Sequence, residues 1–67
     1  MISITVNGKQ AVPESAATVL AFLEEHTINP DHVVVELNKT IVKREYYETT
    51  PLTDGDTVEI LRFVGGG

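Results

Sequence analysis

Both ends of the chain carry the alternation of apolar and polar residues that is typical of a half-buried β-strand. Residues 2–6 alternate in this way, and the pair Asn7-Gly8 follows at once. Asn-Gly accepts the positive φ angles of a type I′ turn, so we expect a hairpin whose returning strand runs over residues 9–12. At the other end, an apolar-rich run over residues 57–64 predicts a longer last strand.

A single short helix is predicted after residue 14. Ser15 or Thr18 can accept a hydrogen bond from the free N–H groups of its first turn. The helix should end before Pro30, because the residue before a proline disfavours helical backbone. The residues at the spacing i, i+3, i+4, i+7 share one face of this helix, and they are Val19, Phe22, Leu23 and His26.

Two further strands and an irregular stretch fill the middle of the chain. Residues 32–37 predict a strand, residues 38–40 a turn, and residues 41–43 a short strand. Residues 44–53 follow no regular pattern and leave room for one 3₁₀ turn. Asp54-Gly55-Asp56 is typical of a tight turn that leads into the last strand.

This order of elements predicts the α+β class and a β-grasp, or ubiquitin-like, arrangement. One helix would pack on a mixed sheet of four or five strands, with the first and last strands parallel at its centre. We assign residues 1–64 to this domain and residues 65–67 to a flexible glycine tail. Glycines contribute no side chain to a core and lose more backbone freedom on ordering than other residues.

Composition narrows the possible partners. The chain of 67 residues has ten acidic and five basic residues, a net charge of −5, and no cysteine. This charge matches a phosphate backbone poorly, so we expect no nucleic acid partner. No apolar run approaches the roughly 20 residues that span a bilayer, and no basic leader precedes the first strand. We therefore expect no membrane partner and a cytoplasmic location. A basic protein surface is one candidate partner, because its charge complements that of the chain.

Several short motifs follow one another along the chain in this order: Val6-Asn7-Gly8, Thr18-Val19 and Leu23, Ile41-Val42-Lys43-Arg44-Glu45, Leu52 and Asp54-Gly55-Asp56, and an apolar strand that ends in Gly65-Gly66-Gly67. In these motifs the whole chain resembles the ThiS family, the sulfur-carrier proteins of thiamin thiazole synthesis within the ubiquitin-like β-grasp superfamily. One departure is Lys43, where members of that family often carry proline; we expect no change in chemistry from it.

This resemblance implies a sequence of steps at the C-terminus. A ThiF-like, E1-like adenylyltransferase, using ATP and Mg that it binds itself, would adenylate the carboxylate of Gly67. A sulfur-donor enzyme such as a cysteine desulfurase would supply the sulfur of a Gly67 thiocarboxylate, which a ThiG-like thiazole synthase would consume. The tail of Gly65, Gly66 and Gly67 would enter the partners' active sites. The carrier itself would hold no cofactor and no catalytic residue of its own.

The domain in front of the tail would have to supply recognition. Alternation places Val58 and Ile60 toward the helix, and Glu59, Leu61 and Phe63 on the open face of the sheet. We predict a partner-contact patch of Leu61, Phe63, Val64, Val34 and Arg62. The alternatives to such a patch are a bulge that turns one apolar residue inward, or isolated exposed apolar residues. For Arg62 the alternative is a solvated or internal ion pair.

The histidines and tyrosines are the remaining candidates for a site. His26 and His32 are the only histidines, and no further ligands cluster with them in the sequence, so no metal site is expected. Tyr46 and Tyr47 should divide between one packed and one exposed ring. The alternative functions are the small subunit of molybdopterin synthase, another sulfur carrier of this fold, a ubiquitin-like modifier conjugated through Gly67, and an inert interaction module. An enzyme with its own active site is the least favoured.

Overall fold

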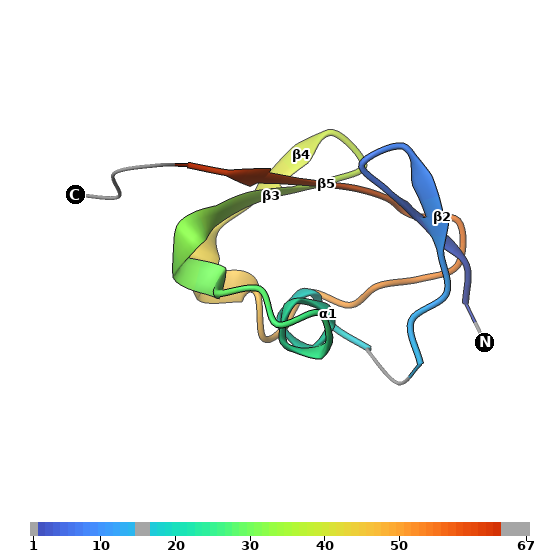
Figure 1. Cartoon of the computed structure of the whole chain (residues 1–67), viewed down its shortest axis with the longest axis horizontal. Coiled ribbons are helices and arrows are strands. Elements are labelled where there is room, and N and C mark those ends of the chain that lie inside the picture. The colour runs from blue at the N-terminus through green and yellow to red at the C-terminus, as the bar shows by residue number, and fades with distance from the viewer. Residues whose placement is uncertain (1, 15–16, 64–67) are drawn as a thin grey trace.

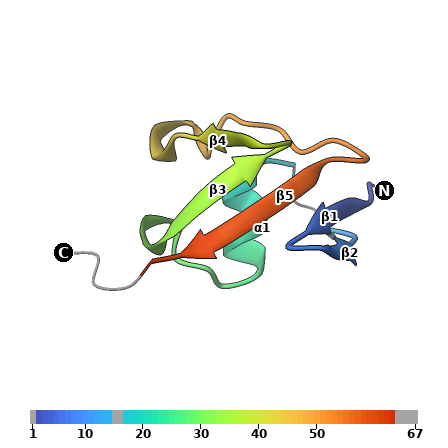
Figure 2. The ribbon, with the colours of Figure 1, turned by 90° about the horizontal axis from the view of Figure 1, so that it is seen from above.

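The computed structural model describes residues 2–14 and 17–63. A five-stranded mixed sheet is covered on one face by helix α1 (Figure 1). The sheet has the order β2-β1-β5-β3-β4, with β1 parallel to β5 and the other neighbours antiparallel (Figure 2). The predicted β-grasp with its first and last strands parallel at the centre is confirmed. The strands are β1 Ile4–Val6, β2 Lys9–Ala11, β3 Val33–Leu37, β4 Thr40–Val42 and β5 Thr57–Arg62.

Two tight turns set the register of the outer strands. Asn7 and Gly8 have φ angles of 50° and 82°, so the predicted turn with two positive φ angles joins β1 to β2. Asn38 and Lys39 have φ angles of 52° and 72° and join β3 to β4 in the same way. Asparagine tolerates the left-handed region better than most residues, which explains why it occupies the first position of both turns.

Helix α1 runs from Val19 to Glu25 and begins where the sequence allows a cap. The hydroxyl of Thr18 accepts a hydrogen bond from the backbone N–H of Ala21 at 3.1 Å. Ser15, the other candidate cap, lies outside the described residues. Three of the four residues of the predicted helix face, Val19, Phe22 and Leu23, are at most 4% exposed and pack against the sheet. The fourth, His26, is exposed, because it lies at the C-cap beyond the last helical residue. The core is completed by Ile4, Val33, Val35, Tyr47, Leu52, Val58 and Ile60.

The stretch between β4 and β5 is irregular, as predicted, and holds a 3₁₀ turn over Arg44–Tyr46. Another 3₁₀ turn, over Pro30–His32, comes directly before β3. Tyr47 is buried and donates a hydrogen bond from its hydroxyl to the carbonyl oxygen of Val33 at 3.2 Å. Burial raises the pKa of the Tyr47 phenol. Tyr46 is exposed, so the two rings divide as expected.

Strand β5 is anchored at its start and along its length by side chains from distant turns. Asn7 donates from Nδ2 to the carbonyl oxygen of Ile60 at 3.1 Å, and its Oδ1 accepts from the N–H of Ile60 at 2.8 Å. Asn38 Oδ1 accepts from the N–H of Thr57 at 2.9 Å, and its Nδ2 donates to Asp56 Oδ1 at 3.0 Å. These contacts extend the backbone ladder of β5 on both of its sides.

Each strand differs from its predicted bounds by one or two residues. β1 begins at Ile4 and not at residue 2, β3 begins at Val33 and not at residue 32, and β4 covers Thr40–Val42 and not residues 41–43. β2 ends at Ala11, one residue before Val12. β5 ends at Arg62 because its antiparallel partner β3 begins at Val33, which pairs with Arg62. Val64 and the predicted glycine tail over residues 65–67 lie outside the described residues.

Candidate functional site at the end of the central strand

The described chain ends one residue beyond β5, at Phe63. Gly65, Gly66 and Gly67 lie outside the described residues, so their predicted roles stay predictions. The other end of β5 is tied to the N-terminal strand: Gly55 N–H donates to Ser3 O at 2.8 Å, and Thr5 N–H donates to Asp56 O at 2.9 Å. The last strand is thus held firmly before it leads toward the C-terminus.

The face of the sheet that points away from α1 carries apolar residues. Val58 and Ile60 are buried in the core beside α1, so alternation places Leu61 on the opposite face of the sheet. Leu61 is 53% exposed and lies directly across from Val34 on β3. Ile41 on β4 is 62% exposed and lies on the same face, because it pairs with Glu36. We call Val34, Ile41 and Leu61, together with Glu36 and Glu59, the outer face.

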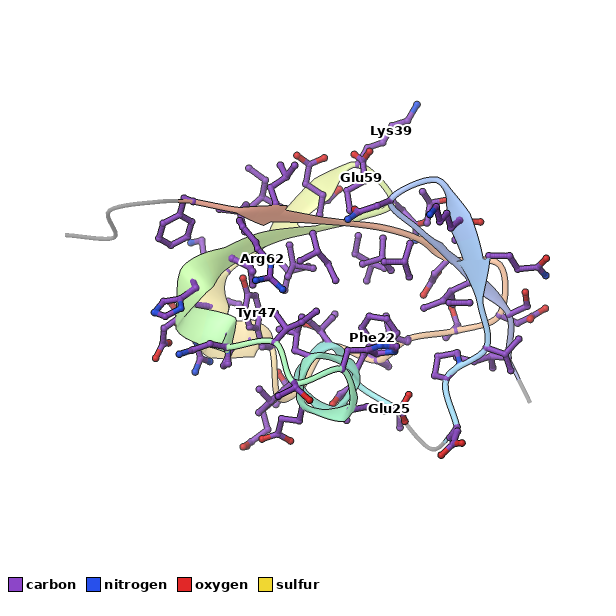
Figure 3. The ribbon with its side chains drawn as sticks, in the orientation of Figure 1. Phe22, Glu25, Lys39, Tyr47, Glu59 and Arg62 are labelled. Atoms are coloured by element: carbon purple, nitrogen blue, oxygen red, sulfur yellow. The ribbon has the colours of Figure 1, made fainter. Side chains whose placement is uncertain are left out.

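The outer face is acidic as well as apolar. Glu36 on β3 and Glu59 on β5 are direct cross-strand partners. Within residues 2–14 and 17–63, neither carboxylate has a basic partner at ion-pair distance. Figure 3 shows Glu59 and Lys39 projecting from the sheet on the side away from α1. Like charges directly opposite one another destabilise a sheet, so this pair costs the fold a little stability.

The structure divides the predicted partner patch. It brings Leu61 and Val34 together, but Arg62 projects from β5 to the other side of the sheet, the side of α1 and Phe22 (Figure 3). Phe63 is 45% exposed and donates its backbone N–H to His32 O at 3.3 Å. It follows the last strand residue, so alternation no longer assigns it to a face. Val64 lies outside the described residues.

Ile41 is an outer-face residue that the sequence prediction did not include in the patch. It sits beside Val42 in a strand of three residues, Thr40–Val42, where two adjacent apolar residues hide the alternation. The two-residue turn before β4 could have placed Ile41 on this face, because the turn length fixes the register of the strand that follows it.

Among the residues that the structure describes, the two histidines belong to no metal site. His26 is the C-cap of α1, and its ring packs against Phe22 at a tilt, with 4.4 Å between ring centroids. His32 lies in the 3₁₀ turn before β3. No group of three or more metal-binding side chains converges within the described ranges. No helix there is long and apolar enough to cross a membrane.

Comparison with known proteins decides the family. The family model described as "ThiS family" matches residues 2–67 of the chain. The chain belongs to the ThiS family. It is 35% identical over 65 residues to the sulfur carrier protein ThiS of Bacillus subtilis, covering 96% of this chain and 98% of that protein. The crystal structure of the thiamine biosynthesis protein ThiS from Geobacter metallireducens is 38% identical, with a TM-score of 0.84 over 98% of this chain and 100% of the other.

A ThiS domain also matches part of larger relatives. The chain is 35% identical over 66 residues to a thiazole synthase of Paramagnetospirillum magneticum, covering 98% of this chain but 20% of that protein. A thiazole synthase of Magnetococcus marinus matches at 33% identity, again over 20% of its length. The chain therefore spans a fifth of the length of these thiazole synthases. Its resemblance to the ThiS family, noted from the sequence motifs, is confirmed.

Proposed function

We propose that this protein, a ThiS-family sulfur carrier of thiamin biosynthesis, takes up its sulfur at the α-carboxylate of Gly67. The observation that carries the proposal is the match to the ThiS family over residues 2–67, which includes the three terminal glycines. A carboxylate is a poor electrophile. Adenylation joins a carboxylate oxygen to the α-phosphorus of ATP and releases pyrophosphate, after which a sulfur nucleophile attacks the acyl carbon and releases AMP.

In this proposal the chain acts as a co-substrate and the partners supply the catalysis. An E1-like adenylyltransferase binds ATP and Mg, a sulfur-donor enzyme such as a cysteine desulfurase supplies a persulfide, and all act in the cytoplasm. The outer persulfide sulfur displaces AMP and forms an acyl disulfide. A thiol then attacks the donor-side sulfur of that S–S bond, which releases the Gly67 thiocarboxylate and leaves a disulfide on the donor side. Thiazole synthase is the proposed acceptor. It is favoured because two proteins named thiazole synthase contain a region similar to nearly the whole of this chain.

The outer face is the proposed contact for the adenylyltransferase. Leu61, Val34 and Ile41 offer apolar area beside the last described residues, and exposed apolar groups gathered on a sheet face mark interaction surfaces. Glu36 and Glu59 add negative charge next to them. The matching enzyme surface would be apolar at its centre and basic at its edge, since complementary charge steers association.

Intact-protein mass spectrometry tests the loading step. The chain is incubated with the adenylyltransferase, ATP, Mg, the sulfur donor and a thiol reductant, and a mass change equal to one oxygen exchanged for one sulfur is expected. The matched control is a chain that lacks Gly67, which should fold normally by circular dichroism but stay unloaded. An unchanged mass for the full chain, with an enzyme proven active on another carrier, would contradict the proposal. Addition of the whole chain to a lysine would instead indicate a protein modifier.

A further inference from the structure

A groove opens on the other side of β5, between α1 and the β1-β2 hairpin. It has a volume of about 240 Å³ and an apolar floor that includes Phe22, Ile28 and Ile60. Phe22 and Ile60 are core residues at 4% and 9% exposure, so the floor is rigid. The ring of His26 lines the groove and packs on Phe22. This surface faces away from Leu61 and the rest of the outer face.

The rim of the groove is cationic in an otherwise acidic chain. Lys9 on β2 and Arg62 on β5 both line it. They are two of only five basic residues in a chain of net charge −5. Across residues 2–14 and 17–63, neither side chain has a carboxylate at ion-pair distance. His26, which also lines the groove, has its Nε2 3.8 Å from the Glu25 carboxylate.

Size argues for a side chain as the occupant. Small-molecule and cofactor sites are commonly about 300–1,000 Å³, and this cavity is smaller, at about 240 Å³. One large apolar side chain fills such a volume, and an apolar floor without a buried charge favours that kind of group. The two cations above the floor favour carboxylates on either side of it.

We propose that this groove docks a short acidic segment of a partner protein, with one apolar side chain on Phe22, Ile28 and Ile60 and flanking carboxylates at Lys9 and Arg62. The outer face excludes the same segment, because Glu36 and Glu59 repel it. The two surfaces lie on opposite faces of one sheet, so a partner in the groove leaves Leu61 free. This binding activity is separate from sulfur loading at Gly67.

The direct test titrates the isotope-labelled full chain with a capped pentapeptide, one Phe between two pairs of Glu, and follows backbone amides by NMR. Saturable shifts are expected at Lys9, Ile28 and Arg62, with Ile41 and Glu36 on the outer face unchanged. A matched peptide with Gln in place of Glu should bind about tenfold more weakly. A second peptide with Ser in place of Phe should lose saturable binding, since the apolar anchor is gone.

Matched variants of the chain complete the test. Lys9→Gln should weaken binding of the acidic peptide about threefold to fivefold, in line with one exposed charge pair. Lys39→Gln removes a cation on the other side of the sheet and should leave the affinity unchanged (Figure 3). The proposal is overturned if the acidic peptide gives no saturable shifts, if the Gln peptide binds equally well, if the shifts map to the outer face, or if Lys9→Gln binds as tightly as the unaltered chain.

Discussion

The two faces of β5 differ in charge although they belong to a strand of six residues. On the outer face, Leu61 lies with Val34 and the glutamate pair, so that surface is apolar and negative. On the inner side, Arg62 borders a groove with an apolar floor and a second cation, Lys9. A step of one residue along a strand reverses the face. The comparison shows how a very small domain presents two chemically opposite surfaces just before its C-terminus.

Both surfaces depend on the same register. A slip of one residue in β5 would bury Leu61 and Glu59 and expose Val58 and Ile60. The side chains of Asn7 and Asn38 hold that register from the two sides of the strand. Their turns therefore position the proposed contact residues, which lie far away in the sequence.

The largest expected effect is on binding at the outer face. Leu61→Asp should weaken the adenylyltransferase complex by more than tenfold, because a buried apolar contact at the centre of an interface contributes about 2 kcal/mol. Leu61 is 53% exposed in the free chain, so the free energy of unfolding should change little. Isothermal titration calorimetry and urea unfolding measure the two quantities.

The control for this variant is Thr57→Asp, which adds the same charge to the same face of β5 at its other end. It should weaken the complex far less than Leu61→Asp. Equal losses for the two variants would mean that charge alone acts and that Leu61 makes no specific contact.

The next effect concerns the anchoring of β5. Asn7→Gly keeps the positive φ but removes both hydrogen bonds to Ile60, which should reduce the free energy of unfolding by about 2 kcal/mol. Asn38→Gly is the matched variant on the other side of the strand, where the side chain bonds to Thr57 and Asp56. Amide hydrogen exchange should accelerate at Ile60 in the first variant and at Thr57 in the second. Uniform acceleration across β5 in both would contradict separate anchors.

Much of this fold could be predicted from local patterns. Alternation, the Asn7-Gly8 pair and the cap at Thr18 each depend on neighbouring residues, and each was confirmed. Side-chain contacts across long separations carry no such local signal. The bonds from Asn7 to Ile60 join residues 53 positions apart, and the sequence shows only that Asn7 suits a turn.

The candidate site could likewise be predicted only where it depends on a local pattern. Leu61 and Val34 fall on one face because strand alternation is strict, as predicted. Arg62 was grouped with them by nearness in the sequence, although the same alternation sends it to the groove (Figure 3). The groove itself could not be predicted, since it forms where the β1-β2 hairpin, α1 and β5 meet in space.

A smaller effect is expected from pH at the start of β5. Burial alone would raise the pKa of Asp56, but hydrogen bonds from Asn38 and Thr53 outweigh it, and the pKa is lowered from 3.8. A carboxyl whose pKa is lower in the folded state adds stability above 3.8 and loses it as the pH falls below that value. Asp56→Asn should therefore cost about 1 kcal/mol at neutral pH. Urea unfolding should show this difference shrinking below pH 3.8, and a difference independent of pH would contradict it.

The smallest effect separates stability from recognition on the outer face. Glu36 and Glu59 oppose one another directly, and Glu59→Gln should raise the free energy of unfolding by about 0.3 kcal/mol by removing their repulsion. The same change should weaken adenylyltransferase binding, because it removes half of the negative charge next to Leu61. A double-mutant cycle with Glu36→Gln, measured at low and high salt, isolates the pair because exposed charges are screened. If both quantities move as expected, the repulsion is a cost in stability that serves recognition; if Glu59→Gln stabilises the chain and binding is unchanged, the acidic character of the outer face has no part in docking.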